Sequence, residues 1–459
     1  MLFHSPPFLL IFLPIALAGY YGLASHARLR LAFLLSASLA FYGYWDLRFV
    51  PLLTASILIN WAIAAMGRRH GYRFLVPAGI AVNLLLLGTF KYVDFFAAAL
   101  GWLFGAQPQP LNLILPLGIS FFTFKQIGYL VDLRRGRAQG YDFLDYATYV
   151  SFFPHLIAGP IVRHDELIPQ LREAPVRPGL EARIGRGLVL LVFGLVKKVV
   201  IADSLVVIAD PLFAGASSHG LGFVEGWVAA LAFGFQIYFD FSGYSDMAIG
   251  MALIFGIMLP MNFNAPYRAA SIRDFWRRWH MTLSRFLRDY LYVPLGGSRR
   301  GAVNQAIAAM VTMVLGGLWH GAGWNFILWG GLHGAALVVN HAWSRAGFAL
   351  PDFASWLATF FVVFVGWVLF RAPDIETASS VLSGMFGFGG GGPGMAMQGE
   401  LWWIAAVAAV ALVGPTSQHL ALEAIRPRPA AAAAAGLVLV AVLLKVGGGA
   451  NNDFIYFQF

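Results

Sequence analysis

A histidine interrupts an apolar run in the stretch "MVLGGLWHGAGWNFILWGGLHG". His320 stands where the run meets a Gly-Ala-Gly break, and Trp319 and Trp324 flank it. An ionisable side chain inside an apolar, membrane-spanning run is costly to bury, and such residues tend to be functional. A neutral imidazole can take a proton from an attacking hydroxyl and return it to a leaving thiolate, as general-base acyl transfer requires. The alternative interpretation is a hydrogen-bonded histidine of the core.

His333 suits that alternative better. It follows His320 by 13 residues, and on one continuous helix this spacing would place the two side chains on nearly opposite faces. We therefore predict a core role for His333.

A second polar stretch, "SIRDFWRRWHMTLSRFLRDYLYVPLGGSRR" over residues 271–300, is rich in arginine. Ser271 and Asp274 fit a capping box, so a helix is expected to begin there. At about 100° per residue, 275–291 separates into an aromatic arc and a polar arc, which predicts one amphipathic helix in the membrane interface. The arginines of the polar arc are Arg277, Arg278, Arg285 and Arg288. They could receive a phosphate-bearing donor such as coenzyme A or a phosphopantetheine arm at a cytosolic mouth, or hold anionic lipid headgroups.

Other charged residues stand inside apolar runs. They are Lys125, Asp203, Asp210, Asp240 and Asp246. An ion path is one interpretation of them. We favour the other, in which they are structural partners for nearby Lys or Arg at the ends of spans.

The elements that position these residues are predicted to be membrane-spanning helices. Fifty-nine per cent of the residues are hydrophobic and 12% are charged, whereas a soluble domain has roughly 25% charged residues. Apolar stretches of suitable length recur, and we count about a dozen spans. Two further segments, 92–105 and 144–162, are short or broken by Pro and Gly and are candidate re-entrant pieces buried in protein. We predict an all-α, polytopic transmembrane helical bundle that forms one domain over residues 1–459.

Basic clusters between the spans set the expected orientation. Arginines near residues 28–30, 68–73 and 134–137 fall on one side if 92–105 does not cross the membrane, and the positive-inside rule makes that side cytosolic. These clusters account for the net charge of +9, so we expect no nucleic-acid partner. Membrane lipids are the expected partners of these basic residues. The chain contains no cysteine, which excludes disulfides, thiolate metal sites and a cysteine nucleophile, and no metal is expected.

Six stretches together resemble the membrane-bound O-acyltransferase (MBOAT) family. They are "FWRRWH", "RDYLYVPLGGSRRG", "GGLWHGAGWNFILWGGLHG", "FFPHLIAGPIVRHDEL", "YFDFSGYSDMAIG" and "FNAPY". Within the family, the chain is most similar to bacterial alginate O-acetylation membrane proteins, with the D-alanyl transfer protein of teichoic acid modification as a more distant relative. The resemblance covers nearly the whole chain.

The resemblance implies three catalytic residues. The near-invariant histidine of the family maps onto His320, and a second position that holds Asn, Asp or His maps onto His280. The terminal "FIYFQF" resembles an aromatic hexapeptide of related transfer systems, whose tyrosine maps onto Tyr456 as an acyl relay. Phenol has a pKa of about 10, so its ester is an activated acyl carrier. The tail, residues 447–459, is expected outside the cytosol, and its alternative role is a hydrophobic anchor.

The implied function is an inner-membrane acetyltransferase. It would move acetyl groups from cytosolic acetyl-CoA across the membrane, for O-acetylation of an exported, alginate-like polysaccharide by a periplasmic SGNH-type acetyltransferase. Two alternatives stay open. One is D-alanyl transfer from a carrier protein, and the other is a transporter for a polysaccharide precursor.

Overall fold

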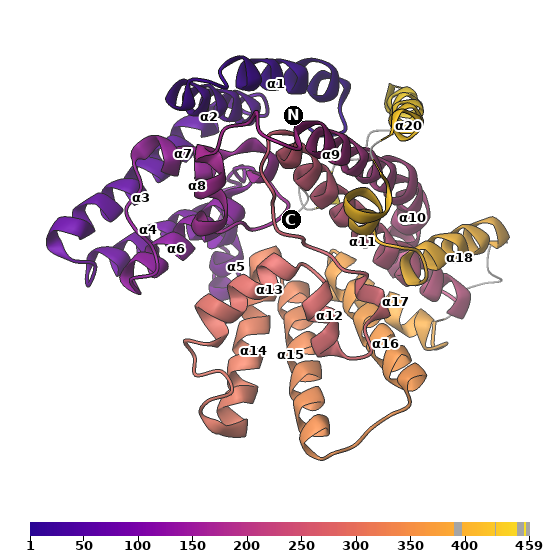
Figure 1. Ribbon diagram of the computed structural model, residues 1–459. Helices are drawn as coiled ribbons and strands as arrows, with labels where there is room; N and C mark the ends of the chain where they lie inside the picture. Colours follow the sequence, from indigo (N-terminus) through magenta and orange to yellow (C-terminus); the bar gives the residue numbers. More distant parts are fainter. Residues whose placement is uncertain (390–396, 427, 448–453, 456–459) are drawn as a thin grey trace. The chain divides into compact units, whose positions relative to one another are not determined.

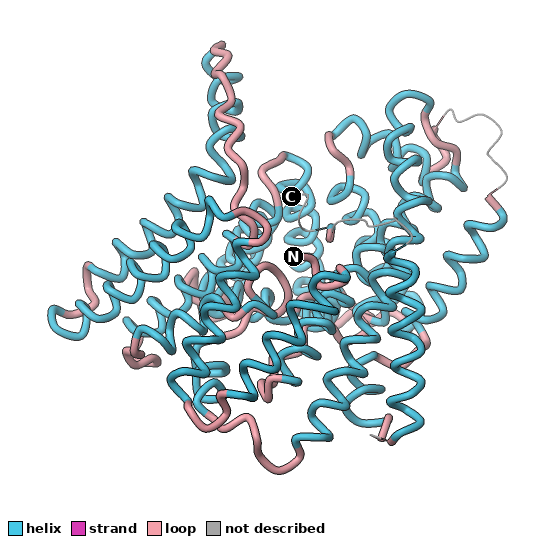
Figure 2. The backbone as a smooth tube through the Cα atoms, turned by 90° about the horizontal axis from the view of Figure 1, so that it is seen from above, coloured by secondary structure: helices cyan, strands magenta, loops and turns pink. Residues whose placement is uncertain are grey.

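The structure is a computed structural model that describes residues 1–389, 397–426, 428–447 and 454–455. This part of the chain is built from helices joined by loops, and it contains no strand (Figures 1 and 2). The prediction of an all-α protein is confirmed.

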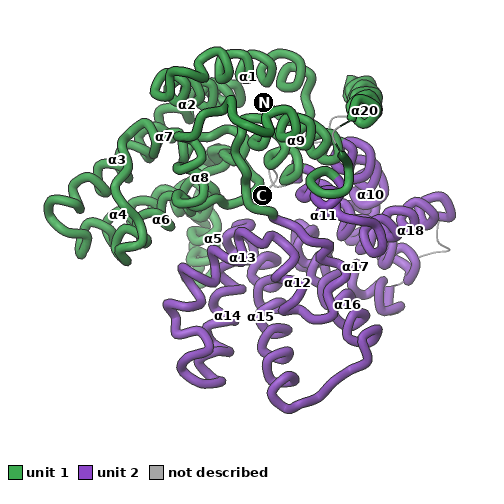
Figure 3. Tube along the Cα trace, in the orientation of Figure 1, with its two compact units in different colours: residues 1–195, 244–261, 421–453 green, residues 196–243, 262–420, 454–459 purple. Residues whose placement is uncertain are grey.

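The chain divides into two compact units (Figure 3). The first comprises residues 1–195, 244–261 and 421–453, and the second comprises residues 196–243, 262–420 and 454–459. The long helix α11 (Phe223–Ile254) belongs to both. The prediction of one domain stays a prediction.

The first unit contains the N-terminal helices and the last long helix. Its elements are η1 (Phe8–Phe12), α1 (Leu13–Gly22), α2 (Ala27–Gly43), η2 (Leu47–Phe49), α3 (Val50–His70), α4 (Leu75–Leu87), η3 (Gly88–Tyr92), α5 (Val93–Phe104), α6 (Ile119–Arg134), α7 (Phe143–Ser151), η4 (Phe153–His155), α8 (His164–Arg172), α9 (Leu180–Leu195), η8 (Leu420–Ala424) except its first residue, and α20 (Pro429–Gly447).

The second unit holds the histidines singled out by the sequence. Its further elements are η5 (Val196–Ala202), α10 (Asp203–His219), η6 (Pro266–Arg268), α12 (Ile272–Arg278), α13 (Met281–Leu287), η7 (Arg288–Tyr292), α14 (Gly301–His320), α15 (Trp324–Arg345), α16 (Asp352–Arg371), α17 (Ile375–Met385), α18 (Gln398–Leu412) and α19 (Ser417–His419).

Five helical segments of the described chain are long and apolar enough to cross a membrane. They are Leu47–His70, Leu75–Phe104, Gly301–His320, Asp352–Arg371 and Pro429–Gly447. The bent pair Gln398–Leu412 and Ser417–Ala424 adds a sixth if it counts as one span. These helices fit a multi-pass membrane protein. They are fewer than the predicted spans of about a dozen, because other apolar windows lie in helices that are shorter or carry polar residues, such as Gln236 and Asp240 in α11.

The two candidate re-entrant segments differ. Residues 145–162 are buried throughout, and irregular backbone follows α7 and η4, as predicted for a broken segment inside the protein. The prediction for 92–105 is wrong, because α5 continues α4 through the π-helical turn η3 and the whole forms one long helical segment. Trp102 near its end is 86% exposed. The π turn begins at Gly88, which accommodates the turn without ending the helix.

Candidate active site

His320 is the last residue of α14, at a tight helix-to-helix turn. Gly321–Gly323 leave the helix and α15 begins at Trp324, so α14 and α15 lie side by side in the second unit (Figure 1). A side chain at Gly317 would collide with the carbonyl of Phe326, and one at Gly330 would collide with that of Met313. The small residues predicted around His320 therefore permit close packing of these two helices.

Aromatic rings enclose the His320 imidazole, which is 4% exposed. The ring centroids of Trp319, Trp329 and Phe370 lie 4.8, 5.2 and 5.2 Å from it, all edge-on.

His280 sits at a backbone break that the sequence pattern did not predict. Ser271 caps α12, because its Oγ accepts from the Asp274 backbone N–H at 3.1 Å, as expected. The helix then ends at Arg278, and His280 adopts the left-handed conformation, with φ at 41° and ψ at 53°, before α13 begins. The single helix predicted over 275–291 is wrong. Its apolar periodicity continues across the break, and histidine tolerates this backbone region better than most residues.

The surroundings of His280 fix its tautomer. The backbone N–H of Thr282 donates to Asn262 Oδ1 at 3.3 Å, so this atom is an acceptor. His280 Nδ1 lies 3.0 Å from the same oxygen and must therefore donate to it. In the neutral ring, Nε2 then carries the lone pair, and it has no hydrogen-bond partner among the described residues.

Burial lowers the pKa of the His280 side chain to about 3. The residue lies between the short helices α12 and α13, outside the candidate spans, and is fully buried. A neutral ring with a defined tautomer can accept a hydrogen bond through Nε2 at any working pH. Left-handed backbone at a residue other than glycine costs free energy and clusters at functional sites, which agrees with a positioned side chain.

The structure brings His280 and His320 into one aromatic cluster. The ring of Trp319 lies 6.2 Å from the His280 ring and 4.8 Å from the His320 ring, measured between centroids. Both belong to the second unit. The forty residues between them are spanned by α13, η7 and α14, which return the chain to the same aromatic cluster.

His333 belongs to this cluster too, so the predicted placement on an opposite face is wrong. The Trp329 ring lies 5.2 Å from the His320 ring and 4.8 Å from the His333 ring. The spacing rule failed because Gly321–Gly323 break the helix between the two histidines. The predicted core position of His333 agrees with its burial, since it is fully buried and packs against Trp276 and Phe275.

Two described residues of the C-terminal segment, Phe454 and Ile455, contact α11 next to the histidine cluster. Phe454 and Ile455 are buried, at 1% and 3% exposure. The Phe454 ring lies 5.8 Å from that of Phe241, which in turn meets the His280 ring edge-on at 4.7 Å. The backbone N–H of Ile455 donates to Asp240 Oδ2 at 2.8 Å. Tyr456 lies outside the described residues.

Asp240, Phe241 and Asn262 were not predicted as site residues. The first two stand in the family stretch "YFDFSGYSD", whereas Asn262 lies one residue before the family stretch "FNAPY" and is not part of it. Nothing in either stretch indicates which distant segment it contacts.

The four predicted donor-binding arginines flank His280 along the chain. Arg277 and Arg288 are exposed, whereas Arg278 and Arg285 are partly buried. Arg278 Nε lies 2.8 Å from Asp274 Oδ2, and Arg288 Nε lies 2.8 Å from Asp289 Oδ1. Such partly exposed local pairs are weak, so their guanidinium groups can exchange partners for a phosphate.

The charged residues inside apolar runs have partners of several kinds. Lys198 Nζ lies 2.8 Å from both Asp203 Oδ1 and Asp240 Oδ1, and Arg371 lies 2.7 Å from Asp210. These three aspartates have the cationic partners we predicted. Lys125 differs, because its Nζ donates to the Val150 carbonyl at 2.8 Å and lies 3.1 Å from His155 Nδ1.

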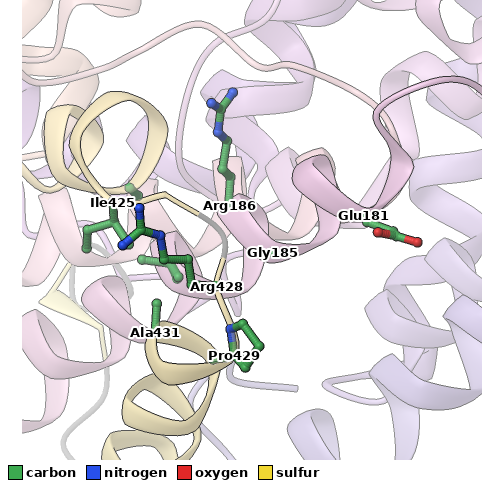
Figure 4. A pocket seen from close by; sticks show the side chains of 10 residues that line it. Glu181, Gly185, Arg186, Ile425, Arg428, Pro429 and Ala431 are labelled. Carbon is green, nitrogen blue, oxygen red and sulfur yellow. The ribbon is translucent and has the colours of Figure 1, made fainter.

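A cavity of about 260 Å³ lies between α9 and the segment leading into α20 (Figure 4). Its charged lining residues are Glu181, Arg186 and Arg428, and all of its lining belongs to the first unit. None of the site residues predicted from the sequence lines it.

Comparison with known proteins bears on this site. The model of the family described as MBOAT, membrane-bound O-acyltransferase family, matches residues 75–372, which include both His280 and His320. The chain is 43% identical over 426 residues to a peptidoglycan O-acetyltransferase of Helicobacter pylori, covering 85% of this chain and 80% of that protein.

Two further relatives are informative. A probable alginate O-acetylase AlgI of Azotobacter vinelandii is 42% identical over 401 residues, covering 85% of this chain and 79% of that protein. A teichoic acid D-alanyltransferase of Streptococcus thermophilus is 30% identical over 238 residues, covering 50% of this chain and 57% of that protein.

Proposed function

Because this chain belongs to the membrane-bound O-acyltransferase family, we propose that it moves acetyl groups from cytosolic acetyl-CoA across the inner membrane for O-acetylation of an exported polysaccharide. The protein is a membrane-bound acyltransferase. The names of its relatives, which concern alginate and peptidoglycan, support an acetyl group and a polysaccharide acceptor.

One observation carries the proposal for the site. His280 and His320 share an aromatic cluster, and the ring of the buried tail residue Phe454 packs against Phe241, which also contacts the His280 ring. Two residues further along the chain is Tyr456, the only hydroxyl-bearing residue after the last long helix. We therefore propose Tyr456 as the nucleophile, His320 as the general base and His280 as a second, neutral imidazole.

In the first transfer, the Tyr456 oxygen attacks the carbonyl carbon of the thioester. His320 accepts the phenolic proton, the carbon–sulfur bond breaks, and the leaving thiolate of coenzyme A takes the proton from His320. His280 stays neutral and accepts a hydrogen bond through Nε2, which orients the reacting groups. The products are free coenzyme A and an acetylated Tyr456.

In the second transfer, a hydroxyl of a periplasmic acceptor attacks the acetyl ester of Tyr456. The carbon–oxygen bond to the phenol breaks, and the phenolate recovers a proton from the attacking hydroxyl. The acceptor is the serine of an SGNH-type acetyltransferase or the polysaccharide itself. A phenol has a pKa of about 10 and a thiol of about 8.5, so the acetyl group passes between carriers of similar leaving ability.

The arginines of the 271–291 segment are the proposed contacts for the phosphates of the donor. A guanidinium binds phosphate oxygens in a bidentate fashion and keeps its charge at all working pH values. Arg277 is the most favourable of the four, because it is exposed and no ion pair of the described residues engages it.

The test is mass spectrometry of the C-terminal peptide after incubation with acetyl-CoA. Wild type should carry an acetyl group on Tyr456, whereas Tyr456→Phe and His320→Ala should carry none. Tyr456→Phe keeps the apolar volume of the tail and deletes only the nucleophilic oxygen. An unmodified tail in a protein that is acetylating polysaccharide, together with an active Tyr456→Phe, would refute the relay.

D-alanyl transfer is the second candidate, because teichoic acid D-alanyltransferases match half of this chain. The same experiment separates the two functions when the donor is a carrier protein charged with D-alanine. A D-alanyl adduct on Tyr456, with none from acetyl-CoA, would replace acetyl transfer. Polysaccharide flux that survives loss of His320 would instead favour a transporter.

A further inference from the structure

Two neighbouring residues of α11 hold two neighbouring residues of the tail. Asp240 accepts the backbone N–H of Ile455 at 2.8 Å, and Phe241 packs against the ring of Phe454 at 5.8 Å. All four residues belong to the second unit and are buried. The contact with Asp240 involves the backbone of the tail, so it does not depend on the identity of the side chain at 455.

The hydrogen bond from Ile455 matters because the Asp240 carboxylate is buried among other charged groups. Lys198 lies 2.8 Å from Asp240 and from Asp203, and the side chains of Lys198 and Asp240 are only 3% and 2% exposed. Lys198 therefore shares its ammonium group between two carboxylates. A buried carboxylate needs donors, and the Ile455 N–H is one of them. Lys198 and Ile455 meet different oxygens of Asp240, so the carboxylate links the ion cluster to the tail.

We propose that Asp240, held by Lys198, is a positioning residue that clamps the tail backbone at Ile455, one residue before Tyr456, and so sets the register in which the tail takes part in acyl transfer. The inference rests on the proposed function of Tyr456 as the acyl relay. It adds a residue that touches neither donor nor acceptor and acts through the tail. Phe241 completes the clamp, because its ring contacts the tail on one side and His280 on the other.

A directed hydrogen bond does what aromatic packing alone cannot. The tail "FIYFQF" offers four aromatic rings, and several of them would fill an apolar site equally well. The bond from the Ile455 N–H to a fixed carboxylate specifies one register. Loss of that bond should therefore cost turnover more than it costs folding or donor binding.

Tail position can be measured directly because the chain has no cysteine. Ile455→Cys introduces a single thiol, keeps the backbone N–H and places the sulfur where the native side chain is 3% exposed. We expect slow maleimide labelling in this background. Adding Asp240→Val should raise the labelling rate roughly tenfold to a hundredfold, the range expected for a lost hydrogen bond to a charged group. Asp240→Asn keeps an oxygen acceptor and should give an intermediate rate.

Asp210→Asn is the matched control. It neutralises another paired aspartate of the same unit, whose partner is Arg371 and not a tail residue. Labelling and turnover should stay at wild-type levels. Labelling in Asp240→Val that equals this control would overturn the clamp.

Kinetics separate positioning from a structural role. In the otherwise wild-type protein, without the Ile455→Cys change, Asp240→Val should lower kcat for Tyr456 acetylation at least tenfold. The KM for acetyl-CoA should stay unchanged. A merely structural role predicts a lower melting temperature with kcat and KM disturbed together, and that result would overturn the proposal.

A change on the tail side keeps the test valid if Asp240→Val does not fold. Ile455→Pro deletes the one N–H that Asp240 accepts and leaves the buried ion cluster intact, whereas Ile455→Val retains it. We expect Ile455→Pro to lose turnover and Ile455→Val to keep it, and equal activity of the two would overturn the clamp. Tyr456→Phe tells failure of the acyl relay apart from failure of the clamp. If Tyr456→Phe is active, the proposed relay function of Tyr456 fails. If Tyr456→Phe is inactive while Ile455→Pro is active, only the clamp fails.

Discussion

The Nδ1 of His280 lies 3.0 Å from the Oδ1 of Asn262, an oxygen that also accepts from the backbone and hydroxyl of Thr282. Asn262 thereby fixes both the orientation and the tautomer of a buried imidazole. The residue precedes α12 by ten positions and contributes nothing to the apolar periodicity of that region. Its function depends on the backbone break at His280, which turns the ring toward it.

Asn262→Ala should lower the rate of acylation by roughly tenfold or more, since the His280 ring loses the acceptor that sets its tautomer. The variant also leaves buried donors unpaired, which should cost about 1–3 kcal/mol of stability. The assay is acetyl transfer from acetyl-CoA in membranes, with expression matched. Asn264→Ala removes an exposed amide two residues away and should behave as wild type.

His280→Ala should reduce activity strongly, whereas His280→Asn should do less harm. The family resemblance implies that Asn is accepted at this position, and an amide can still form hydrogen bonds where a methyl group cannot. The comparison uses kcat for acetyl transfer in purified protein. Equal loss in the two variants would show that the reaction needs the titratable ring itself.

The buried His280 should make folding stability depend on pH. Its pKa is lowered to about 3 in the folded protein, whereas an unfolded histidine titrates near 6.5. Between these values the unfolded state binds the proton and the folded state does not, so stability falls as pH drops below about 6.5 and is flat above it. The slope is roughly 1.4 kcal/mol per pH unit.

Melting temperatures of detergent-solubilised protein at pH 7.5 and pH 4.5 test this expectation. The difference between the two should be smaller in His280→Asn than in wild type. An unchanged difference would mean that the ring is solvated or protonated in the folded protein.

His320→Ala should abolish acylation, because loss of a general base costs about 10²–10⁴ in rate. The protein should still insert and fold, since the glycine contacts that pack α14 against α15 are untouched. His341→Ala changes a half-buried histidine further along α15 and serves as the control. Retained acylation in folded His320→Ala would contradict the mechanism.

Arg277→Gln should raise the apparent KM for acetyl-CoA, and the effect should shrink as salt rises, because added ions screen the attraction to the phosphates. Arg278→Gln should have a smaller effect, since Arg278 already pairs with Asp274. Arg137→Gln, an exposed arginine of the first unit, controls for general surface charge. If Arg277→Gln and Arg137→Gln have the same KM for acetyl-CoA, the arginines do not bind the donor, and the alternative role of holding anionic lipid headgroups is favoured.

Some of the site could be predicted from local pattern, and the failures share one cause. The cap at Ser271, the break after His320 and the burial of 145–162 follow from residue types within a few positions of each feature. The continuous helix over 275–291 and the opposite placement of His333 were wrong. Both predictions assumed one continuous helix. The spacing of apolar residues does not reveal a break at a single residue, because the pattern continues on either side of it.

The sequence by itself determined that this is a multi-pass helical membrane protein, because composition and hydropathy show which segments are apolar enough to lie in lipid. It also determined the family and the histidines worth testing, since the motifs that carry them are contiguous. Only the tertiary structure decided that Trp319 touches both histidines and that Asp240 holds the tail at Ile455. Asp240 and Ile455 are 215 positions apart in the chain. Contacts of that separation depend on how helices pack in space, which no local period or spacing encodes.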